Sequence, residues 1–344
     1  MKVFLKILSI SSYVFSVLVL ITIGVMLYYY LKYRRAVQYT MQNSIFCGNP
    51  KCPMDYVDLP EPTDIPTGMR SYSLPLARYC ADLVLRSVNS FSDKTAFPVP
   101  PGMLELGELY SDQARQTVFG KILLLVSQKT IFVVFRGTQT IEEMKGDLDY
   151  NQTYRVSTAP AHQMRQVRLR HGPVTVARPG VLAQPFEVDV PLVHGGFQQI
   201  YDINKARIKQ CLEANGDVRR VIFCGHSLGA AVAVIGALDT LTSENYSVAV
   251  YNFGQPRVGN EAYSKYAAAS GLTIFKHVNT YDIIPTLPPA VVPNTAEYTN
   301  PYFFAEIGTE ISFSKNHFSI LLNHLLPSYI DNLILREEQP GNSA

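Results

Sequence analysis

The chain has 344 residues and a formal net charge of +2, which gives no electrostatic footprint for binding nucleic acid. It carries no zinc-ligand or phosphate-loop motif, so we expect no metal and no cofactor. About 300 residues follow the N-terminal segment, enough for one α/β domain with a sizeable core. Three of the five cysteines, Cys80, Cys211 and Cys224, fall in apolar segments that are typical of core thiols.

Residues 1–35 predict a transmembrane anchor with a basic flank. The run Ile7–Leu31 has no charged residue, and its 25 residues are long enough to cross a hydrocarbon core of about 30 Å. Three tyrosines lie near the end of the run and three basic residues follow it, and both suit the membrane interface. We expect a retained anchor rather than a cleaved signal peptide, because no small-residue cleavage site precedes the basic residues.

The sequence leaves open which side of the membrane the rest of the chain faces. The basic residues after the run slightly outnumber those before it, which favours the cytoplasm. Glycosylation sequons at Asn151 and Asn245 favour a lumen instead, and so does the close pair Cys47 and Cys52. Whether these two cysteines form a disulfide is equally open.

Three further segments follow the anchor. Residues 36–67 predict a stiff, proline-rich linker, residues 68–338 an α/β domain, and residues 339–344 a C-terminal tail. Within the domain, 122–126 and 130–135 predict a hairpin of strands that leads into Arg136-Gly137-Thr138.

The segment Tyr150–Phe186 predicts an irregular insertion. It contains five arginines, several prolines, and no aspartate or glutamate. Such a segment can dock on anionic lipid, and a solvated loop without a partner is the equally open alternative.

A Gly-x-Ser-x-Gly pattern, Gly225–Ala230 (GHSLGA), lies between two apolar stretches. Val218–Cys224 predicts a buried strand, and Leu228–Leu241 predicts a buried helix. A sharp turn from strand to helix exposes the serine hydroxyl above the sheet, and the helix N-terminus directs N–H groups at any oxyanion formed there. Ser227 is therefore the candidate nucleophile, with the backbone N–H of Leu228 as an oxyanion donor.

A serine nucleophile needs a base and an acid, which in this kind of sheet follow it in the order acid, then histidine. Asp282 comes just after the predicted strand Leu272–Val278, in a loop stiffened by prolines. It is the candidate acid; an aspartate that only caps a turn is the alternative. His277 lies inside the strand and is interpreted as structural. His317 and His324 both lie near the start of a last apolar helix predicted over residues 316–335, in which Pro327 marks either an early bend or the true start.

Several blocks together resemble the class 3 (fungal-type) lipase family of the α/β-hydrolase superfamily. Besides the serine turn and the loop that begins at Asp282, they are Val134–Thr138 (VFRGT), Val193–Phe197 (VHGGF) and Asn252–Asn260 (NFGQPRVGN). The resemblance covers roughly residues 74–335. It implies an α/β-hydrolase-type fold, with a predominantly parallel central sheet flanked by helices.

The same resemblance assigns the remaining roles. It implies that the backbone N–H of Thr138 is the second oxyanion donor and that a short lid covers about residues 140–148. Family spacing favours His324 as the base, with His317 as the alternative, because His324 lies 42 residues after Asp282 and His317 only 35. The family's usual interval is longer still.

The sequence thus predicts a membrane-anchored serine lipase that hydrolyses acylglycerol esters through an acyl-enzyme. Its expected partners are a lipid substrate, either an acylglycerol or a phospholipid, and the membrane surface. Two alternatives are a phospholipase A1-type activity and a catalytically silent lipase-like module that binds a protein.

Overall fold

The computed structural model describes residues 58–62, 65–66, 68–92, 94–138, 152–154, 190–243, 246–292 and 301–338. The predicted anchor, the predicted lid, the C-terminal tail, most of the arginine-rich insertion, and Cys47 and Cys52 lie outside these residues. Among the described helices, none combines the length and the hydrophobicity needed to span a membrane.

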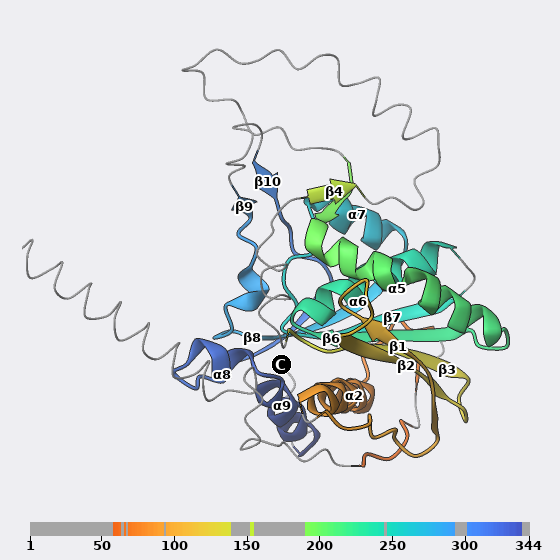
Figure 1. The fold of residues 1–344 in the computed structure, drawn as a ribbon. Coiled ribbons are helices and arrows are strands. Elements are labelled where there is room, and N and C mark those ends of the chain that lie inside the picture. Colours follow the sequence, from red (N-terminus) through yellow and green to blue (C-terminus); the bar gives the residue numbers. More distant parts are fainter. Residues whose placement is uncertain are drawn as a thin grey trace, which may run out of the picture. The chain divides into compact units, whose positions relative to one another are not determined.

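A seven-stranded sheet with the order β1-β2-β3-β6-β7-β8-β11 forms the centre of the domain (Figure 1). Its strands are β1 (Met103–Tyr110), β2 (Val118–Leu125), β3 (Thr130–Phe135), β6 (Arg220–His226), β7 (Ser247–Phe253), β8 (Thr273–Asn279) and β11 (Thr309–Phe313). The strands from β3 to β11 are parallel to one another, whereas β2 is antiparallel to both of its neighbours, β1 and β3. The fold is therefore α/β with a mostly parallel sheet, as the sequence predicted.

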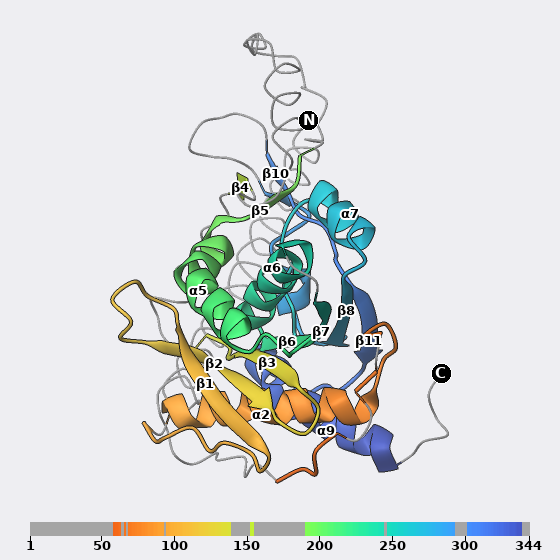
Figure 2. The same ribbon diagram turned by 90° about the vertical axis from the view of Figure 1, so that its right-hand side faces the viewer.

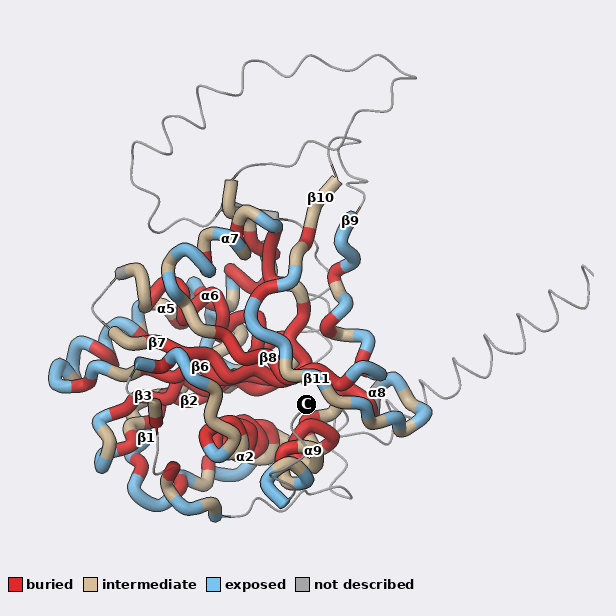
Figure 3. The backbone as a smooth tube through the Cα atoms, turned by 180° about the vertical axis from the view of Figure 1, so that it is seen from behind, coloured by how far each residue is buried: buried red, intermediate tan, exposed pale blue. Residues whose placement is uncertain are grey.

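Helices cover both faces of this sheet (Figures 1 and 2). On one face lie α5 (Gly195–Ala214), α6 (Leu228–Ser243) and α7 (Glu261–Ala269); on the other lie α2 (Leu74–Ser92) and α9 (Leu326–Glu338). Alternate residues of each strand enter two separate cores, so that Val133 packs toward α5 and α6 while Phe132 packs toward α2 and α9. Because both faces are covered, the central strands are predominantly apolar and lie buried (Figure 3).

Shorter elements complete the described part. Two small sheets pair β4 (Gln152–Tyr154) with β5 (Leu192–His194), and β9 (Val291–Val292) with β10 (Tyr302–Phe303). A 3₁₀ turn, η2, covers Ile284–Thr286. Cys80, Cys211 and Cys224 are free and buried, in line with their interpretation as core thiols.

The predicted break of the last helix near Pro327 is confirmed, but a helix that already begins at residue 316 is wrong. The structure has two helices, α8 (Ile320–His324) and α9. Residues before Ile320 are not helical, because Phe318 adopts a left-handed φ of 54° and its N–H bonds to the side chain of Asn316. Pro327 is tolerated because it lies in the first turn of α9, where its missing N–H has no intrahelical role.

Part of the predicted linker packs against the domain. Ile65 is buried in the core beside α2. Asp58 pairs with the buried guanidinium of Arg86 at 2.8 Å, and Glu61 accepts a hydrogen bond from Ser127. The described residues 58–62 and 65–66 are thus attached to the domain that follows them.

A buried histidine in β8 is held in its neutral form. His277 Nδ1 donates to the Asn252 carbonyl, and Nε2 accepts from the Tyr72 hydroxyl, both at 3.1 Å. Phe253 stacks on the ring with centroids 4.8 Å apart. Burial lowers the pKa of His277 from 6.5 to about 4, because a charged imidazolium would lose its hydration there.

We predict that His277 makes the fold sensitive to acid. Its folded pKa is depressed, so its contribution to stability is present above pH 6.5 and is lost as the pH falls toward 4. The loss is about 1.4 kcal/mol per pH unit within that window. Urea unfolding of the wild type and of His277→Gln, which does not titrate, measures it. Equal losses of unfolding free energy in the two proteins would contradict the prediction.

Candidate active site

Ser227 stands at the turn between β6 and α6 in a left-handed conformation, with φ 55°. Its N–H bonds to the Phe253 carbonyl of the neighbouring strand at 3.0 Å. Strand and helix meet closely because the residues two positions before and after Ser227 are both glycine. A Cβ on Gly225 would lie 2.4 Å from the Gly229 carbonyl oxygen, and one on Gly229 would lie 2.2 Å from the Arg136 carbonyl oxygen. The turn predicted from Gly-x-Ser-x-Gly is present.

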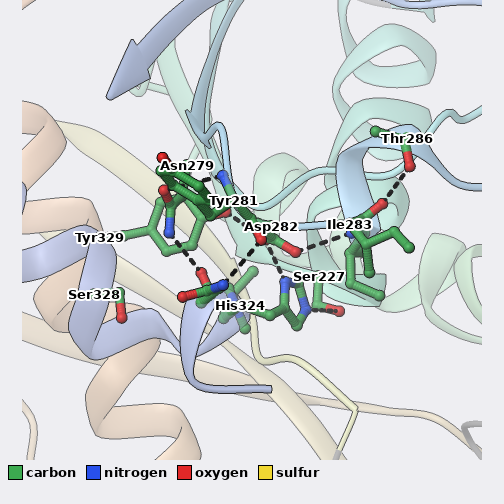
Figure 4. Close-up of polar contacts among 12 residues, drawn as sticks. Ser227, Asn279, Tyr281, Asp282, Ile283, Thr286, His324, Ser328 and Tyr329 are labelled. Atoms are coloured by element: carbon green, nitrogen blue, oxygen red, sulfur yellow. Dashed lines mark hydrogen bonds and ion pairs between the residues drawn. The ribbon is translucent and has the colours of Figure 1, made fainter. Parts of the chain in front are cut away.

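The structure brings together three residues that are far apart in the chain (Figure 4). His324 Nε2 lies 2.7 Å from Ser227 Oγ, and His324 Nδ1 lies 2.6 Å from Asp282 Oδ2. With its Nδ1–H donated to the carboxylate, the neutral ring presents a lone pair at Nε2 to the serine hydroxyl. This geometry suits a general base that removes the serine proton.

The Asp282 carboxylate is fully buried and accepts two further hydrogen bonds. Oδ1 accepts the Ile284 N–H at 2.9 Å, and Oδ2 accepts the hydroxyl of Tyr329 from α9. Burial, together with the nearby charge of Asp282, raises the pKa of Tyr329 well above its ordinary value, so the phenol remains a donor. In the sequence Tyr329 was only an aromatic residue downstream of His324; its bond to Asp282 was missed.

Two asparagines tie the acid loop to the segment that carries His324. Asn279 Nδ2 donates to the carbonyls of Lys315 and Asn323, at 2.8 and 3.0 Å. Asn323 Nδ2 donates in return to the Tyr281 carbonyl at 3.1 Å. The sequence analysis missed both residues, although each lies within three positions of a candidate catalytic residue.

The alternative base, His317, has a different environment. The ring Nε2 of His317 bonds to the Ser328 hydroxyl on α9 at 2.9 Å. The backbone N–H of His317 donates to the Asn323 side chain at 2.7 Å. These contacts brace the segment before α8. Of the two histidines considered, the one that contacts Ser227 is His324.

The predicted oxyanion donors belong to two segments that pack together. Leu228 is the first residue of α6, so its N–H has no acceptor within the helix. Thr138 follows β3 and is buried. Its loop is held by the buried Arg136, whose guanidinium donates to the Gly137 carbonyl at 2.7 Å and lies 3.8 Å from the centroid of Phe91. That both N–H groups bind an oxyanion stays a prediction.

A further glycine fits tightly against the acid and the base. Gly254 follows β7 with a left-handed φ of 58°, and an added Cβ would lie 3.0 Å from His324 Cε1 and 3.1 Å from Asp282 Oδ2. The sequence analysis used this residue only as part of a family block and gave it no role. Its structural signal is the lack of a side chain where β7 ends beside the base.

No group of three His, Cys, Asp or Glu side chains in the described ranges could hold a metal ion.

A nucleophile at a strand-to-helix turn, followed in the chain by an acid and a histidine, is the arrangement of α/β-hydrolases. Residues 132–292 match the family model described as lipase (class 3). This match spans just under half of the chain, and over that region the chain is similar to class 3 lipases.

Individual relatives are similar over part of their length. A lipase of Rhizomucor miehei is 30% identical over 48% of this chain and 39% of its own length. The chloroplastic phospholipase A(1) DAD1 of Arabidopsis thaliana is 30% identical over 36% of this chain and 34% of its own. The solved native propeptide complex of Rhizomucor miehei lipase has a TM-score of 0.47 at 23% identity, covering 75% of this chain and 79% of the other. The chain therefore matches less than half of the length of these two curated relatives.

We predict that Gly254→Ala impairs the reactivity of Ser227. The new Cβ would push on His324 and Asp282, so labelling of Ser227 by a fluorophosphonate should slow by about tenfold or more. Gly271→Ala is the matched control, because Gly271 also has a positive φ of 77° but nothing within 4 Å of an added Cβ. Both variants should lose about 1 kcal/mol of stability from backbone strain. Equal labelling rates in the two variants would show that the contact with the base is unimportant.

Proposed function

We propose that this protein is a serine lipase that hydrolyses ester bonds of acylglycerols through a Ser-His-Asp triad. The observation that carries the proposal is the chain of hydrogen bonds from Ser227 through His324 to the buried Asp282. The match of residues 132–292 to the class 3 lipase model supports the same reaction class. Lipase is also the name of the Rhizomucor miehei relative.

The first half of the reaction forms an acyl-enzyme. His324 Nε2 accepts the Ser227 proton while Oγ bonds to the ester carbonyl carbon, and the carbonyl oxygen becomes an oxyanion. The N–H groups of Leu228 and Thr138 bind this oxyanion. As the ester C–O bond breaks, His324 returns the proton to the leaving alcohol, and the acyl group remains on Ser227.

The second half repeats the same steps with water. His324 removes a proton from a water molecule, whose oxygen attacks the acyl carbon and forms a second oxyanion. The bond to Oγ then breaks, Ser227 regains a proton from His324, and the fatty acid leaves. Asp282 stays ionised throughout and stabilises the imidazolium that forms twice per cycle.

A phospholipase A1-type activity is the second candidate. It uses the same attack on a carboxylic ester and differs only in the head group that the site admits. The observation in its favour is the similarity to the Arabidopsis phospholipase A(1). A silent lipase-like binding module is the third reading, and the bonded geometry of the three residues weighs against it.

We predict that the protein releases fatty acid from an emulsified long-chain acylglycerol and that Ser227→Ala does not. Loss of the nucleophile should lower kcat by about 10⁵-fold or more, because the other triad residues then have no proton to transfer. Ser270→Ala, at the end of α7, is the matched control and should keep full activity. Phospholipid vesicles and a soluble short-chain ester complete the substrate set.

The substrate preference separates the candidates. Faster release from vesicles than from the emulsion would assign a phospholipase. The binding module would be the remaining candidate if folded protein hydrolysed none of the three substrates and its Ser227 did not react with a fluorophosphonate.

We further propose that residues 1–35 anchor the enzyme in a membrane. The support is in the sequence, where an uncharged run of 25 residues has tyrosines near its end and is followed by basic residues. An anchor would hold the active site at the surface where lipid esters are found. The side of the membrane on which the domain lies is a separate question. Glycosylation at Asn151 or Asn245 would place the domain in the lumen.

We predict that the full-length protein stays with membranes during an alkaline carbonate wash. Leu18→Arg combined with Leu20→Arg should release it, because each arginine at the centre of a span costs about 3 kcal/mol. Leu18→Ile with Leu20→Ile is the control and should stay bound. Release of the wild type, or a mature N-terminus after residue 31, would contradict the anchor.

A further inference from the structure

The histidine directly before the nucleophile contacts the base on two sides. His226 is the last residue of β6, and 6% of its surface is exposed. Its Nε2 lies 2.8 Å from the backbone carbonyl oxygen of His324. Its ring also stacks on the ring of His324, with centroids 4.7 Å apart and planes inclined by 30°. One side chain thus contacts both the backbone and the imidazole of the base.

The acceptor fixes the tautomer of His226. A carbonyl oxygen can only accept, so the proton of the neutral ring is on Nε2 and the lone pair is on Nδ1. Nδ1 faces the oxyanion loop, because a Cβ added to Gly137 would lie 2.7 Å from it. His226 is therefore packed between the base and the loop that carries Thr138.

Burial keeps this ring uncharged. Burial and, to a smaller extent, the nearby His324 together lower the pKa of His226 from 6.5 to about 3. A neutral ring can stack on the base without repelling the imidazolium that His324 becomes when it takes a proton. A charged ring in the same place would oppose proton transfer.

The backbone contact answers a local problem of α8. This helix has only five residues and ends at His324, so the carbonyl of His324 lies among the terminal carbonyls that lack an intrahelical donor. His324 itself is buried, and a buried carbonyl without a donor is costly. The Nε2–H of His226 supplies the donor.

We propose that His226 is a positioning residue for the base: it holds the backbone and ring of His324 so that Nε2 stays within reach of Ser227. The inference rests on the proposed hydrolytic function. It goes beyond the three triad residues and the two oxyanion donors, since His226 touches none of the reacting atoms. The position before the serine then has a defined task, which is to supply one N–H and one flat neutral face.

Three substitutions of His226 separate the two contacts. His226→Gln keeps an N–H donor near the place of Nε2 and removes the ring. His226→Phe keeps a ring to stack and removes the donor, and His226→Ala removes both. Each full-length variant is compared with the wild type on a soluble short-chain ester, with active sites counted by exhaustive fluorophosphonate labelling and stability measured by urea unfolding.

The expected result is a loss in kcat with KM within about twofold of the wild-type value, because substrate binding does not involve His226. His226→Ala should lose about a hundredfold and His226→Phe about tenfold in kcat per active site. His226→Gln should recover to within about fivefold of the wild type, because the carbonyl of His324 regains its donor. A merely structural residue would instead lower the number of active sites and leave kcat per site unchanged.

Each other outcome overturns the inference. Unchanged kcat per site in His226→Phe and His226→Ala would show that the base needs no such support. A Gln variant no better than the Phe variant would show that the carbonyl bond is not the positioning contact. If the Ala variant fails to fold, the Gln and Phe pair still decides.

Failure of the proposed function would look different. In that case the wild type hydrolyses no ester, and the rate at which a fluorophosphonate labels Ser227 replaces kcat in the same comparison. Slower labelling in the Phe variant with recovery in the Gln variant would still support the role of His226. Equal rates, or no labelling of the wild type, would overturn it.

Discussion

The left-handed backbone of Ser227 is the constraint on which the rest of the site depends. A residue with a Cβ pays about 1 kcal/mol or more in that conformation, so its surroundings must hold it there. Two buried elements do so, β6 before the serine and α6 after it, and the Phe253 carbonyl fixes its N–H. Because Gly225 and Gly229 bring strand, helix and oxyanion loop into contact, the position of Oγ is set by the packing of the whole central sheet.

The parallel sheet explains why four separate sequence blocks meet at one place. The carboxyl ends of neighbouring parallel strands share an edge, and ligands bind there in α/β proteins. The loop of Thr138 follows β3, Ser227 follows β6, Gly254 follows β7 and Asp282 comes after β8. The base belongs to the same series. His324 ends α8, the short helix that follows β11 in the chain, and β11 is parallel to β8.

The distance along the chain between each site residue and the strand before it also explains what the sequence could and could not predict. Ser227 and Asp282 were found because each follows an apolar strand, and a strand of five to seven residues has a strong local signal. The choice of His324 over His317 needed family spacing. The predicted helix start at residue 316 was wrong because Phe318 has a left-handed backbone and its N–H bonds to the side chain of Asn316. The bonds from Tyr329 to Asp282 and from His226 to His324 join residues 47 and 98 positions apart, and no local pattern encodes such contacts.

The nucleophile and the base are therefore held by different forces, and stability and activity are related differently at each. At Ser227 the function requires strain, so a change that relieved the left-handed backbone would stabilise the fold while removing the nucleophile. At His324 the function requires that buried carbonyls find donors, and Asn279 and His226 supply them. Each missing donor there costs about 1–3 kcal/mol and frees the base at the same time. At Ser227, activity requires a conformation that lowers stability. At His324, activity and stability depend on the same hydrogen bonds.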